Sequence, residues 1–153
     1  MQINITLNGK MITDDAASDE TLYSFLRRHE CYSVKCGCET TNCGLCTVLL
    51  DGEPILSCAK YVAAVNGREV TTLEGVQEEA AAIGGCMADE GSDQCGFCNP
   101  GFLMNAISLF RKNPTPDRQT IEEYMAGNLC RCTGYEGQTR ALLRYAQKRK
   151  ESV

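Results

Sequence analysis

Cysteine is the residue type of this chain that can do chemistry, and its positions are clustered. The sequence has 153 residues and 11 cysteines. Closely spaced thiols can ligate a metal, form disulfides or act as a redox-active pair. The count is odd, the cysteines group as C-x-x-C and C-x-C, and the opening "MQINITLNGK" has neither the basic nor the apolar part of a secretory signal. These features favour metal ligation in a reducing compartment and predict a cytoplasmic protein.

The first group of cysteines has the C-x4-C-x2-C-x11-C spacing of a plant-type [2Fe–2S] site, with three ligands on one loop and the fourth at a distance. Its members are Cys38, Cys43, Cys46 and Cys58. The cluster is net negative and favours backbone N–H donors, which a tight loop supplies; Gly37 and Gly44 allow the turns of such a loop. Structural zinc sites usually pair two C-x2–4-C units, so zinc fits this spacing poorly.

Cys36 is a second candidate for the first ligand, because "KCGC" places two thiols one residue apart. Only Cys38 gives the C-x4-C interval, so we assign the ligand role to Cys38 and regard Cys36 as a bystander. Cys31 and Cys86 lie outside both groups, and we expect them to be small buried hydrophobic residues.

The second group reads C-x2-C…C-x-C, with 31 residues between its halves, and consists of Cys95, Cys98, Cys130 and Cys132. Two ligands as close as those of C-x-C can reach one iron of a cluster, whereas one zinc in relaxed finger geometry accommodates them less easily. Each half precedes an expected helix start, with Pro100 at N1 in one case and a capping box from Thr133 to Glu136 in the other. Helix N-termini and the adjacent Arg131 both favour a negative cluster. On spacing alone, zinc and redox thiols remain open alternatives.

The elements around the first group read as a β-rich unit. Ile3, Ile5 and Leu7 alternate with polar residues, and Asn8-Gly9 predicts a type I′ hairpin turn. A second hairpin turns at Asp51-Gly52, a short strand follows near 68–71, and one helix begins with Ser18 or Asp19 as its N-cap.

The elements around the second group read as helices, which gives an α+β chain. The predicted helices cover about 74–88, a segment starting at Pro100, a segment opened by a capping box from Thr120 to Glu123, and about 136–150. We therefore expect two domains, 1–75 and 76–153. The net charge is −5, which does not suggest nucleic-acid binding, and no apolar run approaches the roughly 20 residues of a membrane span.

Two stretches, "VKCGCETTNCGLCTVLLDG…SC" and "DQCGFCNPG…GNLCRCTGY", resemble the two signatures of the small iron–sulfur subunit of molybdenum hydroxylases, the family of xanthine dehydrogenase, aldehyde oxidoreductase and carbon monoxide dehydrogenase. The resemblance covers nearly the whole chain in the same order. It implies a β-grasp plant-type ferredoxin domain followed by a four-helix-bundle domain, with one [2Fe–2S] cluster in each.

The resemblance also implies partners and a path for electrons. A large subunit carries a molybdopterin cofactor, which Gln94 and Cys132 approach, and a medium subunit carries FAD. The complex hydroxylates a substrate carbon with oxygen from water, and electrons pass through the second cluster, then the first, to the flavin. This chain then has no substrate site of its own, and its partners act on an N-heterocycle such as nicotinate or a purine, on an aldehyde or on carbon monoxide. The alternative is a free-standing two-cluster ferredoxin-type carrier.

Three positions depart from the family pattern without touching a ligand. Thr41 stands where glycine is frequent, Leu45 where alanine is common, and Gln138 where a small apolar residue is usual. These departures bear on reduction potentials and packing rather than on the assignment.

Overall fold

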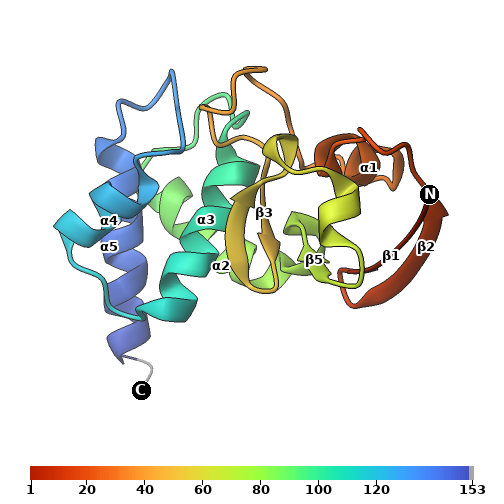
Figure 1. Cartoon of the computed structure of the whole chain (residues 1–153). Coiled ribbons are helices and arrows are strands. Elements are labelled where there is room, and N and C mark those ends of the chain that lie inside the picture. Colours follow the sequence, from red (N-terminus) through yellow and green to blue (C-terminus); the bar gives the residue numbers. More distant parts are fainter. Residues whose placement is uncertain (152–153) are drawn as a thin grey trace.

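The N-terminal half of the protein is a small mixed sheet covered by one helix. The computed structural model describes residues 1–151. The sheet has the strand order β2-β1-β5-β3-β4, with β1 and β5 parallel and the other neighbours antiparallel (Figure 1). Its elements are β1 (Gln2–Leu7), β2 (Lys10–Asp15), α1 (Leu22–Arg28), β3 (Thr47–Leu50), β4 (Glu53–Leu56) and β5 (Glu69–Thr71).

Both predicted hairpins are confirmed by the backbone. Asn8 and Gly9 have φ of 50° and 78°, and Asp51 and Gly52 have 48° and 84°, as type I′ turns require. The predicted N-cap of α1 was wrong: the cap is Thr21, whose hydroxyl accepts the N–H of Ser24. The helix starts later because the backbone at positions 20–22 pairs with residues 60–62 in an extended conformation.

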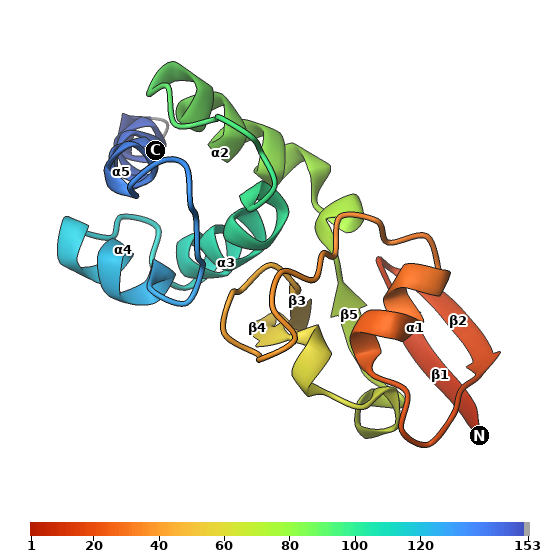
Figure 2. The same ribbon diagram turned by 90° about the horizontal axis from the view of Figure 1, so that it is seen from above.

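The C-terminal half is a bundle of four helices, seen from above in Figure 2. Their bounds are α2 (Gln77–Asp89), α3 (Asn99–Lys112), α4 (Arg118–Met125) and α5 (Glu136–Glu151). The predicted capping box at Thr120 was wrong, because Asp117 is the N-cap of α4 and its carboxylate accepts the N–H of Thr120 at 2.8 Å. Asp117 and Thr120 are both good capping residues, and the helix begins at the earlier one.

The two halves are joined by β3, which is buried on both faces. Val48 and Leu50 point into the core between the sheet and α1, whereas Leu49 belongs to the core of the helical half. Side chains alternate across a strand, and α3 packs on the outer face of β3, so one four-residue strand contributes to two cores. No described helix combines the length and apolarity needed to cross a membrane.

Candidate functional site

The loop between α1 and β3 gathers three cysteines of the first group, and Cys58 joins them from the turn after β4. The Sγ atoms of Cys46 and Cys58 are 3.3 Å apart. The thiols of Cys38 and Cys43 contact each other in a second pair. All four side chains line one small cavity, to which Cys36 also contributes.

The two glycines of this loop are needed for different structural reasons. Gly44 has a φ of 76°, and a Cβ there would also overlap the carbonyl oxygen of Gly127. Gly37 does not have a positive φ; a Cβ there would lie 3.2 Å from Cys43 Sγ and 3.0 Å from Leu45. The expectation that both glycines permit turns is therefore right for Gly44, whereas Gly37 provides room beside a thiol.

Backbone amides of the loop point at a cysteine sulfur, as expected for a loop that holds a negative group. The N–H groups of Thr40 and Asn42 donate to Cys38 Sγ at 3.4 and 3.3 Å. The Thr40 hydroxyl and these amides lower the pKa of Cys38 to about 6. This thiol therefore favours the thiolate form, which is the metal-ligating form.

Two other thiols of the first group lie deeper than Cys38, which is half-buried. Cys43 and Cys46 are buried, and Cys58 is half-buried. Burial, followed by contact with Cys46, raises the pKa of Cys58 to about 12, so a thiolate at this position is costly without a cation beside it. A set of four thiols with amide donors on one side and buried sulfurs on the other fits a cationic iron pair bridged by sulfide.

The second group of cysteines also forms two pairs. Cys95 and Cys132 have their Sγ atoms 3.4 Å apart, and both side chains are exposed. Cys98 and Cys130 form the other thiol contact and are half-buried. Burial, together with Cys130, raises the pKa of Cys98 to about 11. We call these the outer pair (Cys95, Cys132) and the inner pair (Cys98, Cys130).

The pairing corrects one expectation. The neighbours Cys130 and Cys132 do not face one common position; each pairs with a cysteine of the other segment. Among residues 1–151, no three Cys, His, Asp or Glu side chains converge at the spacing of a single ion. The thiols are thus arranged as facing pairs across the loops, which suits a two-iron cluster with one pair for each iron.

The expected helix starts are only partly right. Cys98 is the N-cap residue of α3, so its sulfur lies at a helix N-terminus, and Pro100 is in the first turn. Cys132 lies further from α5, and Thr133 does not cap that helix with a capping box. Its hydroxyl instead lies 3.2 Å from Cys130 Sγ and accepts the N–H of Tyr135 at 3.2 Å.

The two cysteine groups are physically linked. The N–H of Leu129 donates to the carbonyl oxygen of Cys43 at 2.9 Å, and the Asn128 amide donates to the Gly44 carbonyl at 3.2 Å. Asn105 holds Asn128 in turn, donating to its Oδ1 at 2.7 Å. Sequence reasoning missed both asparagines; the available signal was Asn105, a polar residue that interrupts the apolar stripe "GFLMNAISLF".

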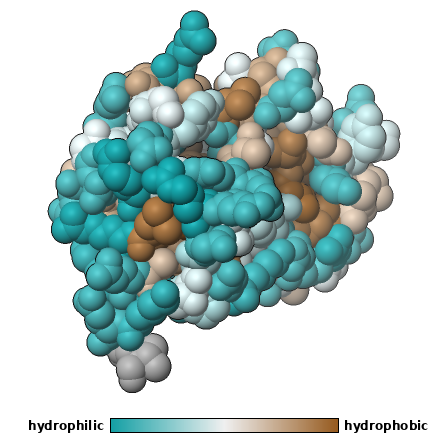
Figure 3. Space-filling model, turned by 90° about the vertical axis from the view of Figure 1, so that its left-hand side faces the viewer, coloured by the Kyte–Doolittle hydropathy of each residue, from teal (hydrophilic) through white to brown (hydrophobic). Residues whose placement is uncertain are grey.

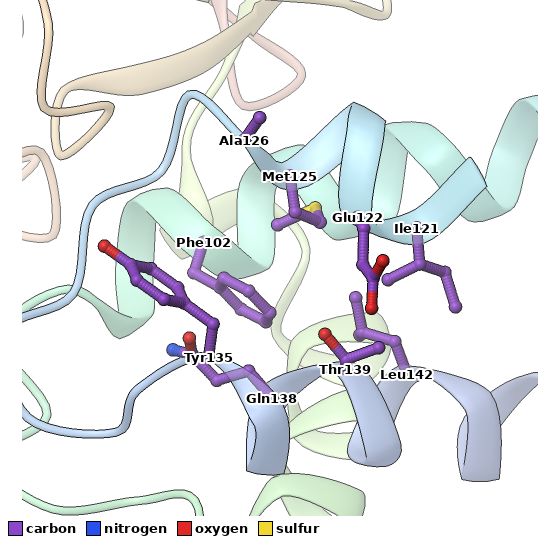
Figure 4. A pocket seen from close by; sticks show the side chains of 9 residues that line it. All are labelled: Phe102, Ile121, Glu122, Met125, Ala126, Tyr135, Gln138, Thr139 and Leu142. Atoms are coloured by element: carbon purple, nitrogen blue, oxygen red, sulfur yellow. The ribbon is translucent and has the colours of Figure 1, made fainter. Parts of the chain in front are cut away.

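Two cavities adjoin the second group. One, with a volume of about 420 Å³, is lined by cysteines of both groups, including Cys38, Cys43 and Cys98. The other, of about 300 Å³, lies between α3, α4 and α5, with Phe102, Tyr135 and Gln138 at one end (Figure 4). Two thiols of the first group, Cys38 and Cys43, therefore share a cavity with the second group.

The outer pair lies on a surface with exposed apolar side chains. Phe97, Leu129 and Tyr135 are 50%, 48% and 45% exposed. Gln94, next to Cys95, is exposed as well. A space-filling view of the α4 and α5 side shows a mostly hydrophilic surface with hydrophobic recesses (Figure 3).

Comparison with known proteins gives two family matches. Residues 5–69 match the "2Fe-2S iron-sulfur cluster binding domain", and residues 72–143 match the "[2Fe-2S] binding domain". The fold and the paired thiols thus define a protein with two [2Fe–2S] domains.

Similar proteins and solved structures identify one family among the proteins with two [2Fe–2S] domains. The chain is 38% identical over 150 residues to the nicotinate dehydrogenase small FeS subunit of Eubacterium barkeri, covering 96% of this chain and 95% of that one. It is 37% identical to the nicotine 6-hydroxylase small subunit of Paenarthrobacter nicotinovorans, covering 94% and 88%. Quinoline 2-oxidoreductase from Pseudomonas putida 86 superposes with a TM-score of 0.90 at 35% identity, covering 99% of this chain and 96% of the matched chain. The chain belongs to the small iron–sulfur subunits of the molybdenum hydroxylase family, whose role is electron transfer.

Proposed function

We propose that this chain conducts electrons from a molybdopterin centre on a large partner subunit, through two [2Fe–2S] clusters, to FAD on a second partner. The first cluster is held by Cys38, Cys43, Cys46 and Cys58, and the second by Cys95, Cys98, Cys130 and Cys132. When bound, each cluster takes up and releases one electron at a time, so a two-electron oxidation can be passed on in single steps. The proposed division at 75/76 assigns one cluster to each domain. The family matches at 5–69 and 72–143 support a boundary a few residues earlier.

The observation that carries this proposal is one cavity lined by all four thiols of the second group and by Cys38 and Cys43 of the first, with a direct backbone link between the groups. Leu129 precedes Cys130 in the chain, and its N–H donates to the carbonyl of Cys43 at 2.9 Å. Cys43 and Cys130 are proposed ligands of different clusters. One hydrogen bond and a few covalent bonds therefore connect the two ligand sets.

The exposure of the outer pair supports an assignment of the surface at which electrons enter this chain. We assign Cys132 and Gln94 to the contact with the molybdopterin, because both are exposed beside Cys95. Phe97, Leu129 and Tyr135 supply exposed apolar surface for the large subunit at the same place. The flavin subunit then receives electrons from the first cluster, which lies beyond the common cavity.

For the complex as a whole we propose an N-heteroaromatic substrate. Relatives named for nicotinate, nicotine and quinoline share 35–38% identity with this chain. The substrate pocket belongs to the large subunit. Eight of the 11 cysteines are proposed metal ligands, and this use of cysteine supports a reducing, cytoplasmic location.

The test is metal and sulfide analysis of the chain purified with and without its partner subunits. We expect about four irons and four acid-labile sulfides per chain and two distinct EPR signals after reduction. Zinc without sulfide would contradict the proposal. A chain that carries both clusters but never associates with molybdenum and flavin subunits would instead support a free-standing ferredoxin-type carrier.

A further inference from the structure

We propose that Gln138 sets the reduction potential of the second cluster by donating a hydrogen bond from its side-chain amide to the sulfur of Cys98. The inference rests on the proposed function, because it takes Cys98 as a cluster ligand. Gln138 is the third residue of α5 and is 2% exposed. Its Nε2 lies 3.8 Å from Cys98 Sγ. A buried amide aimed at a thiol is a positioning and tuning group rather than a ligand.

Thr133 extends the contact to the other member of the inner pair. Its Oγ1 lies 3.2 Å from Cys130 Sγ and 3.2 Å from Gln138 Oε1. The same oxygen accepts the N–H of Tyr135 at 3.2 Å. Gln138 and Thr133 thus form one connected network, and each of them contacts one sulfur of the inner pair.

The chemistry of the donors fixes the orientation of the amide. A metal-bound thiolate only accepts hydrogen bonds, so the Nε2 end of Gln138 must face Cys98 and the Oε1 end must face away. Thr133 has one hydroxyl proton, which it shares between Gln138 Oε1 and Cys130 Sγ. A rotated amide would place Oε1 against the sulfur and bring two electron-rich atoms together. The orientation in the structure is therefore the one that suits an anionic sulfur.

The surroundings of this amide make its hydrogen bond effective. Phe102 and Leu142 are 4% and 0% exposed, and they line the same cavity as Gln138 (Figure 4). In a low-dielectric environment, a fixed dipole acts strongly on a nearby charge. Reduction adds negative charge that spreads onto the cluster sulfurs, so a donor to one of them stabilises the reduced state. Gln138 therefore raises the potential of the second cluster and leaves the first unchanged.

A purely structural role for Gln138 gives a different expectation. At the third helical position, a glutamine side chain often reaches back to cap the N-cap N–H. Here the Tyr135 N–H is already taken by Thr133, and Gln138 turns to the sulfur instead. If Gln138 served only to fill space, a side chain of similar size without a donor would change stability but not potential.

The experiment is an EPR-monitored redox titration of the full chain with both clusters, comparing wild type with Gln138→Met and Gln138→Glu. We expect Gln138→Met to lower the midpoint potential of the second cluster only, and Gln138→Glu to lower it further, because a carboxylate replaces the donor. Gln147→Met, an exposed position on the same helix, should leave both potentials unchanged. Unaltered potentials in both Gln138 variants overturn the inference, even where the melting temperature falls.

A measurement on unsubstituted Gln138 covers the case in which these variants do not fold. The chain is labelled with ¹⁵N in its glutamine side-chain amides, in a Gln94→Met background that removes the other glutamine beside these cysteines. Pulsed EPR of the reduced second cluster should then show a ¹⁵N coupling. A visible second cluster without that coupling overturns the inference, whereas the complete absence of a second cluster overturns the proposed function instead.

Discussion

The main-chain N–H of Leu129 donates to the carbonyl oxygen of Cys43 at 2.9 Å, which joins the loop of one cysteine group to the segment that carries the other. Asn128 supports this contact: its side chain is buried (6% exposed) and donates to the Gly44 carbonyl at 3.2 Å. Asn105 completes the chain of hydrogen bonds at 2.7 Å. One backbone hydrogen bond and two hydrogen bonds from asparagine side chains thus hold the two cysteine groups together, so changes at these asparagines should affect both stability and electron transfer.

Replacing Asn128 with alanine should destabilise the protein and slow electron transfer between the clusters. The substitution removes two hydrogen bonds, at a cost of about 0.5–1.5 kcal/mol each. The Asn105 amide keeps its hydrogen bond to the Tyr124 carbonyl, and the Gly44 carbonyl keeps its hydrogen bond from the Thr47 hydroxyl. Denaturant unfolding measures the first effect, and freeze-quench EPR of the partly reduced chain measures the second. Asn113→Ala, whose side chain makes one exposed contact with Thr115, is the control and should change neither property appreciably. Equal unfolding curves for the two variants would contradict the supporting role of Asn128.

Two glycine-to-alanine substitutions should change the stability of the protein in opposite directions. In Gly101→Ala, the added Cβ would overlap the Gly44 carbonyl oxygen and lie 2.9 Å from the Leu45 Cα, so the two domains would have to move apart. In Gly85→Ala, on α2, the Cβ would meet nothing within 4 Å. Alanine in a helix interior is favoured over glycine by roughly 0.5–1 kcal/mol, so this variant should gain stability. Thermal unfolding of both variants checks the pair, and a tolerated Gly101→Ala would show that the close approach of α3 to the first loop is dispensable.

The spacing predicted which thiols come together in each group, but it did not predict how they pair. The C-x4-C-x2-C loop and the distant Cys58 come together in the structure as their intervals indicated. Cys130 and Cys132 were expected to reach one iron, yet each pairs with a cysteine on a different loop. Neighbouring residues on an irregular loop can point to opposite sides, and only the path of the backbone between α4 and α5 decides their directions.

The first residues of the helices were also harder to predict than the turns. The hairpin turns at Asn8-Gly9 and Asp51-Gly52 were right, because few residues accept two successive positive φ angles. Capping residues are less restrictive: Asp117 and Thr120 could each open α4, and only the hydrogen bond from the Thr120 N–H selects Asp117. Thr41 adopts a φ of 58°, a left-handed conformation that glycine reaches more easily than a β-branched residue.

In the metal-free chain, Cys38 should react with iodoacetamide much faster at pH 7 than Cys58 or Cys98. The thiolate is the reactive form, and Cys38 has a pKa of about 6, whereas Cys58 and Cys98 have pKa values of about 12 and 11. Because its pKa is lowered, Cys38 is largely ionised above pH 6 and loses reactivity as the pH falls through that value. Mass spectrometry of the alkylated protein over pH 5–8 measures each site. Similar rates at the three cysteines would show that the Thr40 and Asn42 amides do not stabilise a thiolate in the absence of metal.

The choice between Cys36 and Cys38 as first ligand is decided by matched serine variants. Cys38 receives two backbone N–H donors and contacts Cys43, and Cys36 is an exposed neighbour in the same loop. We therefore expect Cys38→Ser to lose or strongly alter the EPR signal of the first cluster, while Cys36→Ser keeps it. In both variants the signal of the second cluster should persist, which separates loss of one cluster from general unfolding. A Cys38→Ser protein with a normal rhombic signal, beside a Cys36→Ser protein without one, would reverse the assignment and make Cys36 the ligand.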